Sequence, residues 1–520
     1  MNNIPTFQVA GAALKGRVPR KPLVDVLVVL GIVVNIGLLF INLAPDRPHV
    51  GFRQKAKILL RASPPRIQWM QENEFSEFAQ TNDVDFEFVS AKSFDEVVEI
   101  LEKEKEKPSG ILLADIDDEH GDDLIRAGAV RPIADGARPK ELEEALSEYI
   151  AEAVERSKSN GKVWFLPKRA LVDVAIYLRP AVEEAYLHWK DDRPAIEAAL
   201  KEANGVGLPQ SYTLEKTPDD WDSFDIFVAG WYWAHHPAHW AEQAAVMAHD
   251  HLPPAVTAPR IAHPCGDNED ASDELINTLY RRGASDDDLG KPDALPLLDS
   301  LQWEALFRKH GLLAGGCEKG EGVDSFAVNG MFKERKLAWA PIDQADSLWV
   351  HGGERRDAEP GMPGASDIGW ATMPQGSSLE IKNGEAARPG KSFSFEEVHL
   401  WAVPVHSPSP RLAFQLARFL DQRGLQQRET EAQGMLPIRE DLREDYPILF
   451  RLFWMQQMLD ASFRQLERGT GDVPDRWAVE GLDEKYAKVR RAVVYGRPKD
   501  APVTLAAIRA ATEEAFRNAR

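Results

Sequence analysis

From residue 55 onward, segments with the pattern of β-strands are followed by segments with the spacing of α-helices, and this order constrains the fold most. Strands are expected at residues 55–63, 84–91 and 109–117. The helix before the third strand begins with a capping box, because Glu96 lies three residues after Ser93. Strands that alternate with helices predict an α/β fold with a mostly parallel sheet, covered by helices on both faces.

Polar side chains follow two of these expected strands. Ser63 and Arg66 come after the first strand, while Asp117 and Asp118 lie at the end of the third. In open α/β sheets, ligands bind beyond the carboxyl ends of the strands. We therefore expect these four residues to contact a ligand.

Residues 26–44 contain no charged side chain over nineteen positions. At about 1.5 Å per residue, a helix of this length spans roughly 28 Å, close to the hydrocarbon thickness of a bilayer. Residues 1–22 contain no acid, and their basic side chains precede the apolar stretch. The positive-inside rule then places residues 1–22 in the cytoplasm and the bulk of the chain on the periplasmic or extracellular side of the cytoplasmic membrane.

This apolar stretch predicts a single-pass signal anchor at residues 23–44, in contact with the lipid bilayer. A cleaved signal peptide has a shorter apolar core, of about 7 to 15 residues, and a small-x-small cleavage site. The following sequence INLAPDRPHV has no clear A-x-A site. Retention is therefore favoured over cleavage, which stays open.

The charge of the chain limits its partners. The 62 Lys and Arg residues stand against 83 Asp and Glu residues, which gives a net charge of −21. Such an acidic surface argues against nucleic acid as a partner. The two cysteines, Cys265 and Cys317, could form one disulfide or remain as two buried thiols.

A histidine-rich stretch at residues 233–251 is the main candidate for metal binding. His235 and His239 would share one face of a helix, but Pro237 lies between them and no H-E-x-x-H motif is present. No P-loop, G-x-G-x-x-G or G-x-S-x-G motif occurs in the chain. The sequence therefore predicts no metal, no cofactor and no enzymatic activity.

Six further segments occur in a fixed order between Lys55 and Leu442. They read FSEFAQTNDVDFEFVSAKSFDEVVEIL, GILLADIDDEHGDDLIRAGAVRPIAD, GKVWFLP, TPDDWDSF, FKERKLAWAP and HLWAVPVHSPSPRLAFQLARFLDQRGLQQRETEAQGMLPIRED. In this order they resemble the extracellular solute-binding proteins of ABC importers, in particular the sugar-binding group that includes maltose-binding protein.

The resemblance implies a type II-like periplasmic-binding-protein fold, in which two lobes close on a ligand by a hinge motion. The first lobe would comprise residues 55–160 and about 340–400. The second would comprise residues 161–339 and about 401–520, with the C-terminal helices. The chain would then be a membrane-tethered component of an ABC importer that hands a small polar solute, preferably a carbohydrate, to a permease.

Sugar sites need aromatic rings to stack on the apolar faces of the solute. Four tryptophans at expected strand ends or crossovers are candidates for this role: Trp164, Trp339, Trp349 and Trp401. A second function stays open, since the chain departs from the family at Phe165, where the family has Gly. Such a chain could have lost ligand binding and serve as an extracytoplasmic scaffold or accessory subunit of a membrane protein complex.

Overall fold

The computed structural model describes residues 53–236, 260–265, 269–319, 322–351, 367–471, 474, 477 and 481–519. The chain divides into two compact units, Met1–Gln54 and Lys55–Arg520. The fold described below is that of the second unit.

The predicted membrane anchor at residues 23–44 lies outside the described residues. Within the ranges that are described, no helix is both long enough and apolar enough to cross a membrane. The prediction of a single-pass membrane location is wrong by this finding, since it needed such a helix. It rested on the apolar stretch, on the basic residues before it and on the lack of a clear cleavage site.

One large sheet passes through this unit, with the strand order β2-β1-β3-β13-β7-β9-β8. Its strands are β1 Gln54–Arg61, β2 Val84–Ala91, β3 Ile111–Asp117, β7 Leu166–Leu178, β8 Arg260–Ile261, β9 Leu337–Asp343 and β13 Ser394–Pro404. Shorter strands join it at β4 Val130–Arg131, β10 Ile368–Ala371 and β14 Thr470–Gly471. β1 and β3 are parallel, as the sequence predicts, whereas β13 runs antiparallel to both β3 and β7.

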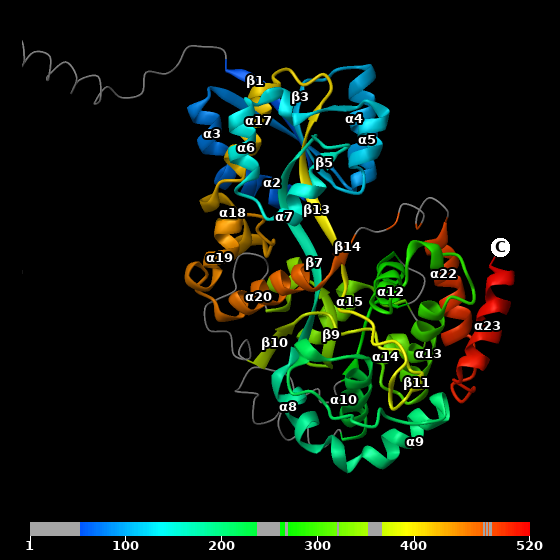
Figure 1. The fold of residues 1–520 in the computed structure, drawn as a ribbon. Coiled ribbons are helices and arrows are strands. Elements are labelled where there is room, and N and C mark those ends of the chain that lie inside the picture. The colour runs from blue at the N-terminus through cyan, green and yellow to red at the C-terminus, as the bar shows by residue number, and fades with distance from the viewer. Residues whose placement is uncertain are drawn as a thin grey trace, which may run out of the picture. The chain divides into compact units, whose positions relative to one another are not determined.

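β7 and β13 are long strands that connect two groups of elements (Figure 1). The first half of β7 pairs with β13, and the second half, from Asp173 to Leu178, pairs with β9 and β10. β13 pairs with β7 from Glu396 onward and reaches β3 at His399–Ala402. These two crossover strands therefore join a first lobe, built on β1–β3, to a second lobe, built on β9 and β10.

Helices cover the first lobe, and most of them follow the N-terminal strands in sequence. They are α2 Pro64–Met70, α3 Ser76–Thr81, α4 Phe94–Glu106, α5 Gly121–Ala127, α6 Pro139–Leu146, α7 Ala151–Arg156, α17 Pro410–Leu420 and α18 Arg423–Gln433. The predicted capping box at α4 forms in part: Ser93 Oγ accepts from the Glu96 amide, but the Glu96 carboxylate accepts from the Lys92 amide and not from that of Ser93. α17 packs so closely on the first lobe that a Cβ at Gly136 would lie 2.1 Å from the Pro410 carbonyl oxygen.

The second lobe is mainly helical. Its helices are α8 Arg179–His188, α9 Arg193–Asn204, α10 Ser223–His235, α12 Glu269–Arg281, α13 Leu295–Lys309, α14 Gly315–Lys319, α15 Ser325–Lys333, α16 Ser347–Val350, α22 Leu482–Arg490 and α23 Leu505–Asn518. After α18, the chain forms α19 Glu440–Leu449 and α20 Phe453–Arg468, and α20 packs against β7 and β10. Short hairpins occur at Lys158–Val163 and Ile381–Ala386.

In the structure, the C-terminal half of the chain is distributed between the two lobes differently from what the sequence predicted. β9 and β10 pair with the second-lobe half of β7, and Trp303 Nε1 donates to the Ser377 carbonyl at 2.9 Å. The segment expected in the first lobe, about residues 340–400, therefore packs largely in the second. β13 then carries the chain into the first lobe, so that α17 lies there and not in the second lobe.

Cys265 and Cys317 form a disulfide, one of the two arrangements that the sequence left open. The bridge joins the segment after β8 to α14, 52 residues further along the chain. Backbone hydrogen bonds in both directions between Cys265 and Val323 hold the same place. The disulfide therefore fixes the segment that contains Pro264, which is a wall of the pocket described next.

Candidate functional site

A pocket of about 240 Å³ lies against the crossover strands β7 and β13. We call it the acid pocket, because eight of its sixteen lining residues are acidic. These are Glu119 after β3, Asp173 on β7, Asp270, Asp273 and Glu274 on α12, Asp343 on β9, and Glu396 and Glu397 on β13. Residues from both lobes thus contribute to one pocket.

Strand register brings several of these acids together. Asp173 lies opposite Asp343 in the antiparallel pair of β7 and β9. On the other side of β7, Glu396 lies opposite Val172, so that three strands deliver carboxylates to neighbouring positions. A side chain from α12 fixes this arrangement: Asn277 Nδ2 donates to Asp173 at 3.0 Å, and Asn277 Oδ1 accepts from the Phe395 amide at 2.8 Å.

The carboxylates of the acid pocket are electrostatically unfavourable in the free protein. Burial raises the pKa of Asp173 from 3.8 to about 7, and the nearby Glu274 raises it further, against the opposing effect of Arg281. Burial, followed by repulsion from Asp346, also raises the pKa of Asp343 well above its usual value. Burial and two neighbouring acids raise the pKa of Glu119 to about 7. These three carboxyl groups therefore keep a proton to a higher pH than usual, because their surroundings disfavour the negative charge.

Five of the acids accept hydrogen bonds from neutral donors, among them Glu274, which accepts from the Thr278 hydroxyl at 3.1 Å. Asp173 accepts from an amide side chain, as described above. The Ser325 amide donates to Asp270 at 2.7 Å, the Ala345 amide to Asp343 at 2.8 Å, and the Thr470 hydroxyl to Glu396 at 3.0 Å. The other carboxylate oxygen of Glu396, Oε1, is buried without a hydrogen-bond partner.

Glu274 and Glu397 each lie close to a basic side chain. Arg281 lies 2.5 Å from Glu274, and His399 Nε2 lies 2.9 Å from Glu397. Among the lining residues that the structure describes, there is no Lys, Arg or His. These two neighbours therefore offset part of the charge from behind the pocket wall.

The four polar residues predicted from strand ends lie outside the lining of the acid pocket. Ser63 is exposed at the start of α2, and Arg66 forms an ion pair with Glu429 at 2.9 Å. Asp117 is buried and lies 2.6 Å from His120 Nδ1. Asp118 Oδ1 accepts from the Val398 amide at 3.0 Å, and its other oxygen lies 3.3 Å from Arg156.

The four predicted tryptophans do not line the acid pocket either. Trp401 is buried, and its Nε1 donates to Asp421 at 3.2 Å. Trp164 and Trp349 are half-buried, and each has a lysine ammonium a little over 5 Å from a ring centroid. Trp339 is buried and lines a smaller cavity in the second lobe. For all eight predicted residues, a ligand-binding role stays a prediction.

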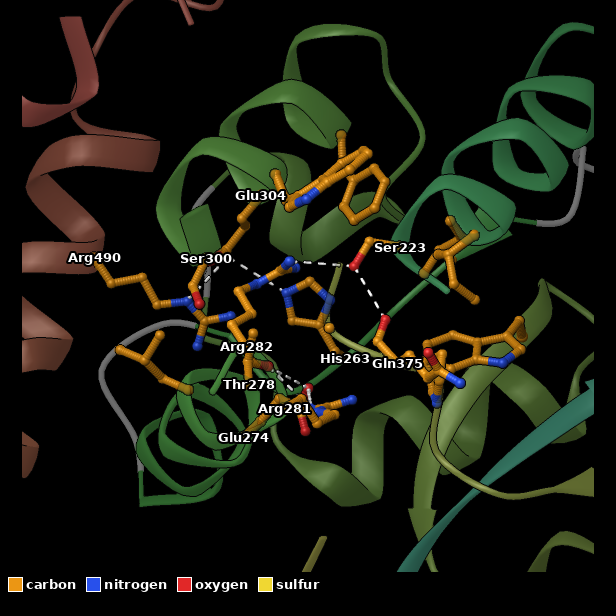
Figure 2. Close-up of a pocket in the computed structure, with 18 residues that line it drawn as sticks. Ser223, His263, Glu274, Thr278, Arg281, Arg282, Ser300, Glu304, Gln375 and Arg490 are labelled. Atoms are coloured by element: carbon orange, nitrogen blue, oxygen red, sulfur yellow. Dashed lines mark hydrogen bonds and ion pairs between the residues drawn. The ribbon is translucent and has the colours of Figure 1, made fainter. Parts of the chain in front are cut away.

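The smaller cavity that Trp339 lines has a volume of about 90 Å³ (Figure 2). About three water molecules occupy this volume in liquid water. Its charged side chains bind one another: Arg490 Nε lies 2.8 Å from Glu304, and Arg281 lies 2.5 Å from Glu274. Arg282 donates to Ser223 Oγ at 3.2 Å. The cavity is too small for a sugar or a similar solute, and its ion pairs hold the helices of the second lobe together.

The histidine-rich stretch is described only in part. His235 Nδ1 lies 2.8 Å from the Trp231 carbonyl oxygen, and His236 Nε2 lies 2.6 Å from Asp192. The remaining histidines of the stretch, from His239 onward, lie outside the described residues. In the described part of the chain, no group of three or more His, Cys, Asp or Glu could hold a metal ion.

Sequence reasoning did not single out the acids of the pocket, although a signal was present. Asp173 interrupts the apolar stretch ALVDVAIYL, and Glu396 and Glu397 lie side by side in the strand sequence SFEEVHLW. A charged residue inside a buried strand is costly unless it has a partner or a function. Such positions are therefore candidates for a site, in addition to polar residues at strand ends.

No protein-family model matches the chain, and no curated protein matches it. Many solved structures do. The GacH receptor of Streptomyces glaucescens, solved unliganded and with acarbose, is 14% identical with a TM-score of 0.56, and the match covers 90% of this chain and 100% of that one. Maltose-bound MalE3 of T. maritima is 12% identical with a TM-score of 0.58, at 89% and 98% coverage.

The fold is that of the two-lobed solute-binding proteins. A solute-binding protein of an ABC transporter from Thermotoga lettingae, bound with alpha-D-tagatose, gives a similar match: 14% identity, a TM-score of 0.57, and coverage of 90% and 100%. The predicted α/β class and two-lobed architecture are confirmed. These structural neighbours are binding proteins and not enzymes.

Proposed function

We propose that this chain is the substrate-binding component of an ABC importer, and that it captures a small polar solute in the acid pocket. The observation that carries this proposal is the position of the pocket: it lies on both crossover strands and takes residues from both lobes. A relative rotation of the lobes about β7 and β13 would open or close such a pocket. The closed form would then present the solute to a permease.

The size of the pocket limits the solute. The pocket has a volume of about 240 Å³, which about eight water molecules occupy in liquid water. Common ligand pockets are larger, at roughly 300–1,000 Å³. A monosaccharide or a solute of similar size fits this volume better than a longer oligosaccharide. The ligands of the structural neighbours, maltose and tagatose among them, favour a carbohydrate-like solute.

The test is thermal unfolding of the full chain in the presence of single sugars, polyols, amino acids and amines. A solute at a hundred times its dissociation constant should add about 2.7 kcal/mol to the free energy of unfolding. A clear rise of the midpoint with one class of solute would support the proposal. Midpoints that stay unchanged across the whole panel would contradict it.

One observation favours a second function, that of a scaffold which binds a protein and no solute. Arg66 and Asp118, which their positions after strand ends place near a ligand, form ion pairs with other side chains of the chain. If the solute panel gives no shift, co-purification with the full chain would show whether a protein partner binds instead. A partner that binds equally well to a variant with substitutions in the acid pocket would support the scaffold.

A further inference from the structure

The acid pocket also indicates what kind of solute it accepts. We infer that the solute carries at least two ammonium groups, as an aliphatic polyamine or a small amino sugar does. The inference rests on the proposed function, since it names the chemical class of the solute in the same pocket. Four observations support it: the excess of negative charge, one unpartnered carboxylate oxygen, the nature of the remaining walls, and the arrangement of the acids.

The excess of negative charge is the first observation. The acids come from α12, β7, β9, β13 and the end of β3, and no lining residue described is basic. Arg281 and His399 lie close to Glu274 and Glu397, and Arg281 also acts on Asp173. Arg156 acts on Glu119 and Glu396, and His120 on Glu119. These four bases are fewer than the eight acids. Like charges close together in a poorly solvated place repel strongly, and a neutral solute would leave that repulsion unrelieved. A solute with ammonium groups would offset it directly.

The second observation is the free carboxylate oxygen of Glu396. This side chain is only 5% exposed, and it lines the pocket. Its Oε2 accepts from the Thr470 hydroxyl, which orients the carboxylate, while Oε1 has no hydrogen-bond partner. A buried acceptor without a partner is costly, and a donor from a bound solute removes that cost. An ammonium group carries three such donors.

The third observation concerns the walls between the acids. They are mainly apolar and contain a single aromatic ring: Leu171, Val172, Pro264, Pro341, Ile342 and Phe395. A sugar site needs flat rings to stack on the sugar faces, whereas methylene groups only need apolar surface. Carboxylates separated by aliphatic walls match ammonium groups that are separated by methylenes.

The fourth observation is that the acids are spread over several walls of the pocket. Among the described residues, no three of them are close enough together to hold a metal ion. A divalent cation needs several oxygen ligands at one point. An organic cation with charges at both ends can instead reach separate carboxylates. The arrangement therefore favours an organic cation over a metal ion.

The first part of the test compares ligands by titration calorimetry with the full chain. The ligands are spermidine, the glucosamine disaccharide with free amines, its N,N′-diacetylated form, maltose and calcium chloride. The two disaccharides have the same ring skeleton and differ in charge. We expect spermidine or the free-amine disaccharide to bind, and the neutral form to bind at least tenfold more weakly. Binding should weaken as the salt concentration rises, because salt screens the attraction.

The second part of the test uses variants that remove one charge each. Asp173→Asn and Glu396→Gln should each weaken binding of the amine about tenfold or more, since each removes a charged partner from a poorly solvated contact. The matched control is Glu514→Gln on α23, an exposed acid outside the pocket lining, which should change the affinity less than twofold. Unfolding midpoints of the free variants would show that each is folded.

The outcomes separate the inference from the proposed function. If a neutral sugar binds as tightly as the amines, or calcium binds and the amines do not, the class of solute is wrong, although a solute is bound. If none of the ligands binds, the inference is overturned, and the wider thermal-unfolding panel decides on the proposed function. If amines bind but Asp173→Asn and Glu396→Gln behave as the control does, the acid pocket is not the site and the inference is overturned.

Discussion

Two groups of buried charges lie on the crossover strands, and they differ in how their charge is balanced. Besides the acid pocket, a second group lies where β7 and β13 meet the first lobe. We call it the charge cluster; it comprises Arg66, Asp115, Lys168, Arg169, His399 and Glu429. Its acids and bases are in contact with one another, whereas the acids of the pocket mostly accept from neutral groups.

The electrostatic consequences of the two groups are opposite. Burial raises the pKa of Asp115, but Lys168 at 2.5 Å and His399 at 3.1 Å lower it far more, to well below its usual value. At Asp173, burial and Glu274 raise the pKa to about 7. The acids of the charge cluster are therefore paired with bases of the chain. The acids of the pocket mostly accept from neutral groups, and this difference supports the proposal of a ligand in the pocket.

Breaking the charge cluster should have the largest effect. Arg169→Met removes the guanidinium that donates to Glu429 at 3.0 Å and lies 3.8 Å from Asp115. Because buried acids lose a partner, the free energy of unfolding should fall by about 3–5 kcal/mol, measured by urea denaturation. Lys216→Met, at an exposed position, serves as the control and should cost less than about 0.5 kcal/mol. A loss as small as that of the control would show that the cluster is not structural.

Neutralising Asp173 should have the opposite effect to Arg169→Met: it should stabilise the free protein at high pH. The folded chain keeps a proton on Asp173 up to a pH of about 7, whereas the unfolded chain loses it near 3.8. The free energy of unfolding of the wild type therefore falls as the pH rises between these values, by at most about 4 kcal/mol. The charged groups that face the Asp173 carboxyl are Glu274, Asp270 and Arg281 of α12 and Asp343 of β9.

Asp173→Asn removes this loss, so the variant should be more stable than the wild type at pH 8 and no more stable at pH 4. Urea denaturation of both proteins at the two pH values measures the difference. Glu514→Gln, which has the same change in charge, should follow the wild type at both pH values. A parallel fall of the wild type and Asp173→Asn between pH 4 and 8 would rule out Asp173 as the source.

The salt concentration should also affect the acid pocket and the charge cluster differently, although by a smaller amount. The Debye length falls from about 10 Å at 0.1 M to about 3 Å at 1 M, and screening acts most on charges that solvent reaches. The stability gained by Asp173→Asn at pH 8 should therefore shrink by about 1 kcal/mol between low and high salt. The cost of Arg169→Met should hardly change, since its contacts are buried. Equal salt responses of the two variants would contradict the comparison.

Much of the fold could be predicted from local sequence patterns. The Ser93 cap of α4, the apolar strand up to Asp117 and the parallel pairing of β1 with β3 are all predicted from local patterns. The ordered motifs also indicate the two-lobed fold. The predicted assignment of the C-terminal half to the two lobes differs from the structure, because local patterns do not reveal which lobe a crossover strand leads into.

The candidate site could not be predicted in the same way. Its acids come from segments that extend from Glu119 to Glu397, and only the register of three strands brings Asp173, Asp343 and Glu396 together. The residues predicted to bind a ligand are polar residues at strand ends and tryptophans that could stack on a sugar. Residues such as Arg66 fit that pattern, but their partner in the structure is another side chain, Glu429.

The pairing of β3 with β13 has a consequence for synthesis of the chain. Asp115 lies opposite Trp401, although 285 residues lie between them in sequence. At about 5–20 residues per second, a ribosome needs roughly 15 to 60 s to produce the partner strand. During this time the apolar strand Ile111–Asp117 has an open edge, which favours pairing with other chains. The nascent chain should therefore depend on chaperones until β13 has emerged from the ribosome.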